Sequence, residues 1–231
     1  MSEKTALQVL EPLNIPSVTE TVFEELHQQI LSLDLPPGTK ISEVEVARAL
    51  GVSRQPVRDA FFRLSQLGFL LIRPQRATVI SKISEAAVLR ARFIRTALEL
   101  ACWNVAMEVI TDEQAARLDD ILKQQKAAVR AGDQPRFHQL DDDFHRCICH
   151  VAGHEYVWGL IKEQKAHMDR VRFLSLTKGA ARQAYDDHVA LLDVLRAGRQ
   201  SRLEPLLNEH LGRIATILVT IRAEKPDYFQ E

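Results

Sequence analysis

The sequence predicts a mainly α-helical protein built in two parts. The first is a small unit of three helices and a β-hairpin, and the second is an all-helical antiparallel bundle of about six helices. Two observations carry this prediction. Helix-spaced apolar residues fill most of the chain, while short β-like runs occur only around residues 69–81. Beyond residue 84, helical patterns follow one another across turns such as Ala131-Gly132-Asp133, with no strand-like run between them.

Length and composition set the outer limits. The 231 residues are enough for two domains, and we place a loose arm at residues 1–15, a first domain at 16–82 and a second at 83–231. No apolar run reaches the roughly 18 residues of a membrane helix, and the first residues lack the pattern of a signal peptide. Three cysteines are too few for a disulfide framework. We therefore expect a cytoplasmic protein with no membrane partner.

Three helices are predicted in the first domain. The first helix has an apolar residue at every fourth position, namely Val18, Val22, Leu26 and Ile30. Ser42 has the position of an N-cap, with Glu45 three residues later, and predicts a short helix over 43–50. The third helix runs from about residue 54 to 67 and ends at Gly68.

A β-hairpin follows, with strands predicted at 69–73 and 77–81 around Pro74-Gln75-Arg76. Three helices followed by a hairpin form a winged helix-turn-helix. Between residues 48 and 82 the only acid is Asp59, against seven basic residues, which are Arg48, Arg54, Arg58, Arg63, Arg73, Arg76 and Lys82. Because the whole chain has a net charge of only −1, this is a local positive surface. Such a surface on a helix-turn-helix predicts binding to double-stranded DNA.

The third helix is the expected recognition helix. Its first two turns present Arg54, Gln55 and Arg58, where arginine can pair with guanine and glutamine with adenine. Ser53 could cap the helix or donate to a phosphate, and Arg63 could touch the backbone or pack on the surface. The hairpin adds Arg73 for a phosphate and Arg76 for the minor groove. The alternative is that these side chains are merely solvated.

The bundle is predicted to contain helices at about 85–110, 112–130, 134–152, 155–175, 181–197 and 201–223. Within the third of these, Asp141 lies at the edge of the apolar arc, one turn before His145. His188 and His210 lie in the apolar stripes of the last two helices. A carboxylate and three imidazoles from three helices suit a divalent cation such as zinc or nickel. The alternative for each histidine is a hydrogen-bonded core residue.

Two further groups of polar residues have competing interpretations. A rival cluster of Cys147, His150 and His154 is expected on the surface of the third bundle helix. In the first bundle helix, Arg95 shares its side with apolar residues, so its charge needs a partner. Glu99, one turn later, is the simple partner. The alternative is that Arg95 binds the carboxylate of a small organic acid that also completes the metal's coordination, which makes Arg95 and Glu99 candidate effector-binding residues.

The segment from Pro36 to Ile80 resembles the winged-helix domain of the GntR family of bacterial transcription regulators. The helical remainder resembles the effector-binding FCD domain of the FadR subfamily. Many FCD domains carry an Asp, a His one turn later and two later His residues, in the order of the metal candidates here, Asp141, His145, His188 and His210. Two positions depart from the family pattern: Ala77 replaces a glycine after the wing arginine, and Val44 replaces a basic residue of some relatives.

The resemblance implies a ligand-responsive transcription regulator, a repressor acting as a homodimer on a near-palindromic operator, with a small organic acid as effector. Two other functions stay open. In one, the helical domain only dimerises and any metal is structural. In the other, the protein is a metal-dependent hydrolase or lyase, since a metal with open positions can activate water. The sequence has no nucleophile motif and no phosphate-binding glycine loop to support that enzyme.

Overall fold

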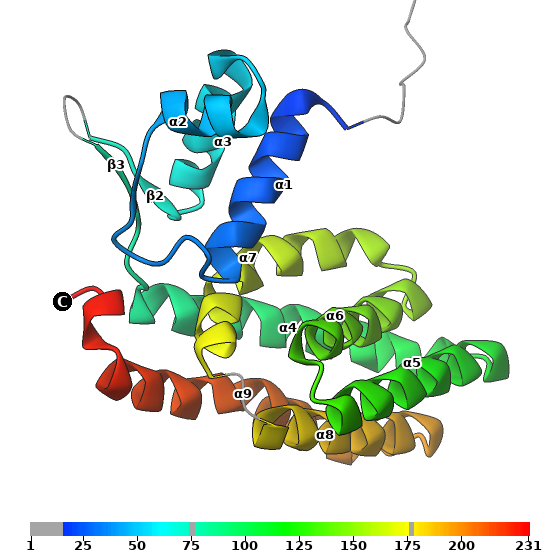
Figure 1. The fold of residues 1–231 in the computed structure, drawn as a ribbon. Coiled ribbons are helices and arrows are strands. Elements are labelled where there is room, and N and C mark those ends of the chain that lie inside the picture. The colour runs from blue at the N-terminus through cyan, green and yellow to red at the C-terminus, as the bar shows by residue number, and fades with distance from the viewer. Residues whose placement is uncertain (1–15, 74–76, 176–177) are drawn as a thin grey trace, which may run out of the picture.

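The structure is a computed structural model that describes residues 16–73, 77–175 and 178–231 (Figure 1). The predicted arm at residues 1–15 and the hairpin tip with Arg76 lie outside the described residues. Two lobes are stacked on each other, a small N-terminal lobe and a larger helical lobe. The predicted fold class is confirmed.

The N-terminal lobe contains three helices and three short strands. They are α1 (Val18–Leu31), β1 (Lys40–Ile41), α2 (Glu43–Leu50), α3 (Arg54–Gln66), β2 (Leu70–Leu71) and β3 (Thr78–Ile80). The three helices match the predicted ones closely. As predicted, Ser42 caps α2 by accepting from the Glu45 backbone N–H at 3.2 Å. Ser53 precedes α3 but makes no side-chain cap bond, so its hydroxyl stays available.

The small sheet differs from the predicted hairpin. Its strands are antiparallel in the order β1-β3-β2, so β3 lies in the centre. The hairpin strands are shorter than the predicted 69–73 and 77–81. The extra strand β1 pairs Lys40 with Val79 and Ile41 with Thr78. Two residues are too few to show an alternating pattern, so β1 exists only through this pairing and was not predictable from periodicity.

The helical lobe contains the six predicted helices. They are α4 (Glu85–Val109), α5 (Asp112–Ala131), α6 (Gln134–Val151), α7 (Glu155–Leu174), α8 (Lys178–Arg196) and α9 (Gln200–Glu224). Helix α8 begins three residues before the predicted residue 181. The prediction started late because Lys178 and Gly179 add no apolar residue to the sequence pattern. Among the described helices, none is both long and apolar enough to cross a membrane.

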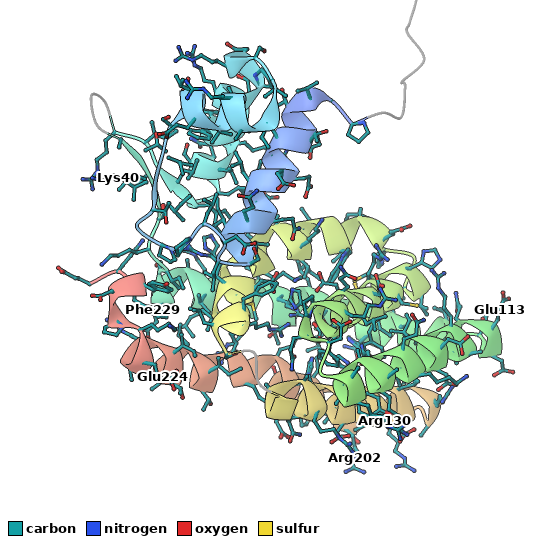
Figure 2. The ribbon with its side chains drawn as sticks, in the orientation of Figure 1. Lys40, Glu113, Arg130, Arg202, Glu224 and Phe229 are labelled. Atoms are coloured by element: carbon teal, nitrogen blue, oxygen red, sulfur yellow. The ribbon has the colours of Figure 1, made fainter. Side chains whose placement is uncertain are left out.

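The C-terminal segment returns to the junction between the lobes, which the sequence did not predict. After a 3₁₀ turn at Pro226–Tyr228, Phe229 forms a parallel bridge with Ile83 (Figure 2). The Ile83 N–H donates to the Tyr228 carbonyl at 2.8 Å, and the Gln230 N–H donates to the Ile83 carbonyl at 3.0 Å. The short connection between β3 and α4 is therefore held in place from the far end of the chain.

Each lobe has its own apolar core. The N-terminal core is built around Val57, Phe61 and Leu64 of α3, and it also takes in Ala166 from α7 of the other lobe. The largest core of the helical lobe surrounds Trp103 of α4. Helix α7 is thus shared between the two cores, which makes it a structural link between them.

Candidate metal centre and DNA-reading surface

The exposed face of α3 carries the predicted recognition residues. The side chains of Arg54 and Arg58 are 60% and 56% exposed, and both approach the same carboxylate oxygen of Glu43 in α2, at 3.4 and 3.3 Å. Gln55 donates to Asp59 at 2.8 Å. Solvent-exposed pairs of this kind are worth little, so these side chains can exchange partners easily.

Arg63 and Arg73 have different surroundings. Arg63 pairs with Glu20 of α1 at 2.6 Å, and its guanidinium lies 3.7 Å from the ring centroid of Phe23. In this structure Arg63 therefore packs on the protein surface, which is the second of the two roles expected for it from the sequence. Arg73 is exposed at the base of the hairpin. The charge count along the sequence missed Glu20 and Glu43, because these acids precede the basic segment and reach it only through folding.

The predicted metal ligands converge inside the helical lobe. Asp141 and His145 come from α6, His188 from α8 and His210 from α9, and one ligand atom from each lies within 4.8 Å of all the others. Nε2 of His210 is 3.3 Å from Nε2 of both other imidazoles. Two ligands bonded to one zinc ion at about 2.0–2.1 Å are separated by roughly 3.3 Å. The donor set and its spacing fit a divalent metal.

Asp141 is almost fully buried, although the sequence placed it at the edge of the apolar arc. Its Oδ1 lies 3.4 Å from Nε2 of His188, and its Oδ2 accepts from Nη1 of Arg172 at 3.1 Å. Burial opposes its ionisation, yet the charge of the neighbouring Arg172 guanidinium holds the pKa of Asp141 well below its usual range. The carboxylate is therefore in the charged form that binds metals.

The Nδ1 atom of each imidazole is bound to an oxygen on the side away from the cluster. The partners are Glu99 Oε2 for His145 at 2.6 Å, Gln125 Oε1 for His188 at 2.9 Å, and Asp187 Oδ2 for His210 at 3.0 Å. Since these oxygens accept, each Nδ1 is the donor, which leaves each Nε2 facing the centre of the cluster. Such outer partners orient metal-binding imidazoles.

Burial also keeps two of the imidazoles neutral. It lowers the pKa of His210 to about 3 and that of His188 well below its usual range, with neighbouring histidines adding to both effects. A histidine binds a metal only in its neutral form. Two of the three imidazoles are thus ready for a cation at any pH near neutrality.

The Arg95–Glu99 pair lies behind the cluster. Nε of Arg95 donates to Oε1 of Glu99 at 2.6 Å, and both side chains are at most 1% exposed. This is the simple pairing expected from the sequence. Glu99 has a second role that the sequence analysis missed, because its other oxygen accepts from Nδ1 of His145. Nη1 and Nη2 of Arg95 have no hydrogen-bond partner among the described residues. Effector binding by Arg95 stays a prediction.

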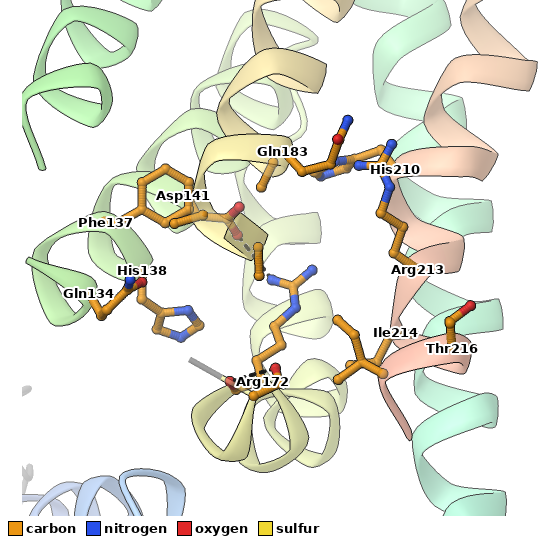
Figure 3. A pocket seen from close by; sticks show the side chains of 15 residues that line it. Gln134, Phe137, His138, Asp141, Arg172, Gln183, His210, Arg213, Ile214 and Thr216 are labelled. Carbon is orange, nitrogen blue, oxygen red and sulfur yellow. Dashed lines mark hydrogen bonds and ion pairs between the residues drawn. The ribbon is translucent and has the colours of Figure 1, made fainter. Parts of the chain in front are cut away.

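A cavity of about 360 Å³ opens beside the cluster (Figure 3). Asp141 and His210 form part of its wall, together with two arginines, Arg172 and Arg213. Arg95 and Glu99 are not among the described residues that line it. Arg213 donates to Oδ1 of Asp187 at 2.9 Å, and Asp187 is the hydrogen-bond partner of His210. The other cavity arginine, Arg172, donates to Asp141 of the cluster.

Sequence reasoning missed four residues of this site. Gln125 had a signal, because it is a polar residue three positions after Leu122 on the apolar side of α5. Asp187 and Arg213 are next to His188 and one turn after His210, but many surface residues share that spacing. Nothing in the local pattern of α7 marks Arg172.

The rival cluster is not assembled. Cys147 was expected on the surface but is only 6% exposed, because its side chain packs into the main core of the helical lobe. His150 is exposed and lies 3.5 Å from Glu155. Among the described residues, the Asp/His₃ cluster is the group with metal-binding geometry.

Comparisons with known proteins identify one family for each of the two lobes. The family described as "Bacterial regulatory proteins, gntR family" matches residues 18–80, and the FCD domain matches residues 91–213. FCD domains often bind metal. The HTH-type transcriptional repressor RspR of Escherichia coli (strain K12) is 34% identical, over 100% of both chains. A regulator encoded in an unstable DNA locus of Streptomyces ambofaciens is 29% identical over 90% of this chain and 88% of its own.

Solved structures share the fold. E. coli McbR/YncC matches with a TM-score of 0.75 at 23% identity, over 89% of this chain and 99% of that chain. A transcriptional regulator GntR from Rhodococcus sp. RHA1 matches with a TM-score of 0.68 at 22% identity, over 87% of this chain and 97% of that chain. The matching families and relatives are those of transcription regulators, so the hydrolase or lyase alternative has no support. This chain belongs to the GntR family, in its FCD-containing subfamily, and is a DNA-binding transcription regulator, not an enzyme.

Proposed function

We propose that the helical lobe binds one divalent metal, zinc or nickel, and a small organic acid that modulates operator binding by the N-terminal lobe. The observation that carries the proposal is the convergence of four buried, pre-oriented ligand atoms at the wall of a cavity that two arginines also line. The proposed metal ligands are Asp141, His145, His188 and His210. Three imidazoles and one carboxylate suit a borderline cation and leave coordination positions open for a ligand.

The cavity supports an anionic effector. A volume of about 360 Å³ is at the small end of ligand pockets, and it suits a compact molecule. Arg172 and Arg213 can receive a carboxylate with the paired donors of a guanidinium. Bound metal would supply a Lewis acid for a further oxygen of the same molecule. Arg95 stays a second candidate, supported by its two guanidinium nitrogens that have no hydrogen-bond partner among the described residues.

On the DNA side, we propose a homodimer that reads a near-palindromic operator with two recognition helices, about one helical turn apart. The proposed DNA contacts are Ser53, Arg54, Gln55, Arg58, Arg63, Arg73 and Arg76. The relative RspR is named a repressor, which supports repression here. The effector would act by binding the DNA-competent and DNA-incompetent arrangements with different affinity, since only differential binding shifts such an equilibrium.

The outer face of α4 supports dimerisation with a second copy of this chain. Phe93 is 73% exposed, and Leu89, one turn earlier, is 37% exposed. Large apolar side chains exposed together on a helix commonly mark an interface. Sedimentation of the Phe93→Glu variant tests this surface: a shift to monomers supports it, and an unchanged dimer excludes it.

The first experiment is metal analysis by mass spectrometry on protein purified without a histidine tag or added metal. Wild type should hold about one ion per chain, and the His188→Ala/His210→Ala variant should hold none. Metal-loaded protein would then be screened with small carboxylic acids for release from operator DNA. Absence of tightly bound metal, even after zinc or nickel is added, would overturn the proposed centre.

A second candidate function deserves the same experiment. In this function the helical lobe only dimerises and its metal is structural. The burial of the polar side chains of the cluster favours a structural metal, because the metal would stabilise them. Metal removal that unfolds the lobe, combined with no release from DNA by any acid tested, would favour this alternative.

A further inference from the structure

Helix α7 connects the cavity with the N-terminal lobe. Arg172 faces the cavity and Arg170 faces the other lobe, as expected for residues two positions apart on a helix. Ala166, six residues before Arg172, belongs to the core of the N-terminal lobe. At about 1.5 Å per residue, these contacts are separated by roughly 9 Å along one rigid element.

At the cavity end, α7 is tied to the metal cluster through one carboxylate. The two oxygens of Asp141 are divided between partners. Oδ1 faces His188 at 3.4 Å. Oδ2 accepts from Arg172, and Figure 3 shows these two side chains beside each other. The same guanidinium lines the cavity and is 19% exposed. An anion that enters the cavity therefore competes with Asp141 for Arg172, and any shift of Asp141 is felt by Arg172 directly.

Between the two ends, buried ion pairs fix α7 against α6. Nζ of Lys165 is 2.9 Å from Oδ1 of Asp142 and 2.5 Å from Oδ2 of Asp169, and the lysine is 1% exposed. His138 of α6 lies 3.8 Å from the other oxygen of Asp169. Removing one partner from such a buried network is costly, so the two helices keep one relative position. Displacement of α6, or of the α7 backbone at Arg172, should then be carried along α7 as a body.

At the other end, α7 holds two carbonyls of the N-terminal lobe. Nη2 of Arg170 donates to the Ser81 carbonyl at 2.7 Å, at the point where β3 leaves for α4. Nε2 of His167 donates to the Leu67 carbonyl at 3.0 Å, at the end of the recognition helix α3. The His167 ring also stacks on Phe69, with centroids 4.6 Å apart. Because both carbonyls lie next to the ends of α3 and β3, a small shift of α7 would change the orientation of α3.

We infer that Arg172 is the sensing residue of the cavity and that α7 carries its displacement to the recognition helix through Arg170 and His167. The inference rests on the proposed function, since it assumes that the cluster and cavity are the ligand site. It adds which residue senses occupancy and which contacts transmit it.

Hydrogen-exchange mass spectrometry on the full chain tests the inference, with zinc alone as the probe. Two segments report on the response of the N-terminal lobe. In residues 64–71 the Phe69 N–H donates to the Leu64 carbonyl. In residues 80–84 the Ser81 N–H donates to the Phe69 carbonyl. In wild type, zinc should change exchange in both segments by about threefold or more, beyond its local effect on α6, α8 and α9. Calorimetry measures zinc uptake on the same samples.

Three variants assign the route. At zinc concentrations that calorimetry shows to saturate each variant, Arg172→Gln should lose the response in both segments, and Arg172→Lys should restore part of it. If Arg172→Gln does not fold, Arg170→Gln and His167→Ala test the output end: each should take up zinc, with Arg170→Gln losing the response at 80–84 and His167→Ala at 64–71. Glu163→Gln, exposed on the same helix, is the matched control and should respond as wild type does.

The possible failures are distinguishable. Absence of zinc uptake by wild type would overturn the proposed metal centre. Zinc uptake with local protection of the cluster helices, but no change in the two reporting segments, would overturn only the inference. A full response in Arg172→Gln would exclude Arg172 as the sensing residue.

Discussion

The N-terminal lobe and the metal cluster hold the same types of charged side chain in opposite ways. Arg58 on α3 is 56% exposed and shares Glu43 with Arg54 at 3.3 Å, whereas Arg95 is fully buried and bound to Glu99 at 2.6 Å. Each cluster imidazole is oriented by a specific oxygen, while Arg54 and Arg58 depend on one exposed acid.

The difference matches what DNA binding and the proposed metal centre would each require. Phosphates on a duplex are numerous, and exposed cationic side chains that neutralise them gain affinity through counterion release. A single cation needs ligand atoms held in place before it arrives. Metal binding, stability in acid and DNA affinity should each depend on how the charged and polar side chains of the lobe concerned are held.

The largest expected effect is that of metal on the helical lobe. Because the native cluster is preformed and the unfolded chain has no such site, zinc at about 1,000 times its dissociation constant should stabilise the fold by about 4 kcal/mol. Thermal unfolding with and without a chelator measures the change. The His188→Ala/His210→Ala variant should show no zinc-dependent shift, and an equal shift in that variant would place the ion elsewhere.

The buried His27 lets the pH dependence of stability be tested in the N-terminal lobe. Unlike the cluster imidazoles, it is not oriented by a carboxylate or amide oxygen among the described residues. It stacks on Phe23, and its Nε2 has no hydrogen-bond partner among the described residues. Burial, with help from Lys162, lowers its pKa from 6.5 to about 4. Between these values the unfolded chain binds more protons than the folded one, so stability is complete above pH 6.5 and falls as the pH drops towards 4.

The loss of stability from His27 should reach at most about 3 kcal/mol at the acidic end. Urea unfolding of wild type and His27→Leu at pH 7 and pH 5 measures it. The variant should lose less stability between the two pH values than wild type does. Equal losses would show that His27 does not control the acid sensitivity of this lobe.

The orienting oxygens of the cluster should have an intermediate effect. Gln125→Leu keeps the size of the side chain but leaves Nδ1 of His188 without its acceptor, so zinc affinity should fall by about 10- to 100-fold. Gln124→Leu, at an adjacent position on α5 but outside the cluster, is the control. Calorimetric titration with zinc compares the two, and unchanged affinity in Gln125→Leu would mean that packing alone orients the ring.

The sequence predicted the six bundle helices and the four cluster residues because both depend on local periodicity. Asp141 and His145 share a helix face, and His188 and His210 stand out as polar residues in apolar stripes. The partners of the cluster were harder, since Arg172 and Asp187 meet it only through helix packing. The strand β1 and the Ile83–Phe229 bridge were missed for the same reason: each depends on a distant segment, not on its own residues.

The smallest effects should separate two arginines of the same helix. Arg58 is on the exposed face of α3 with a weak partner, so Arg58→Ala should weaken operator binding by about tenfold, or about 1.4 kcal/mol. Arg63 is already engaged by Glu20 and by the ring of Phe23, so Arg63→Ala should weaken binding by no more than about threefold. Fluorescence anisotropy with an operator selected from a random DNA library compares both variants at several salt concentrations. Equal losses would mean that Arg63 leaves Glu20 when DNA binds, and the packing seen in the free protein would then not decide which arginines contact the duplex.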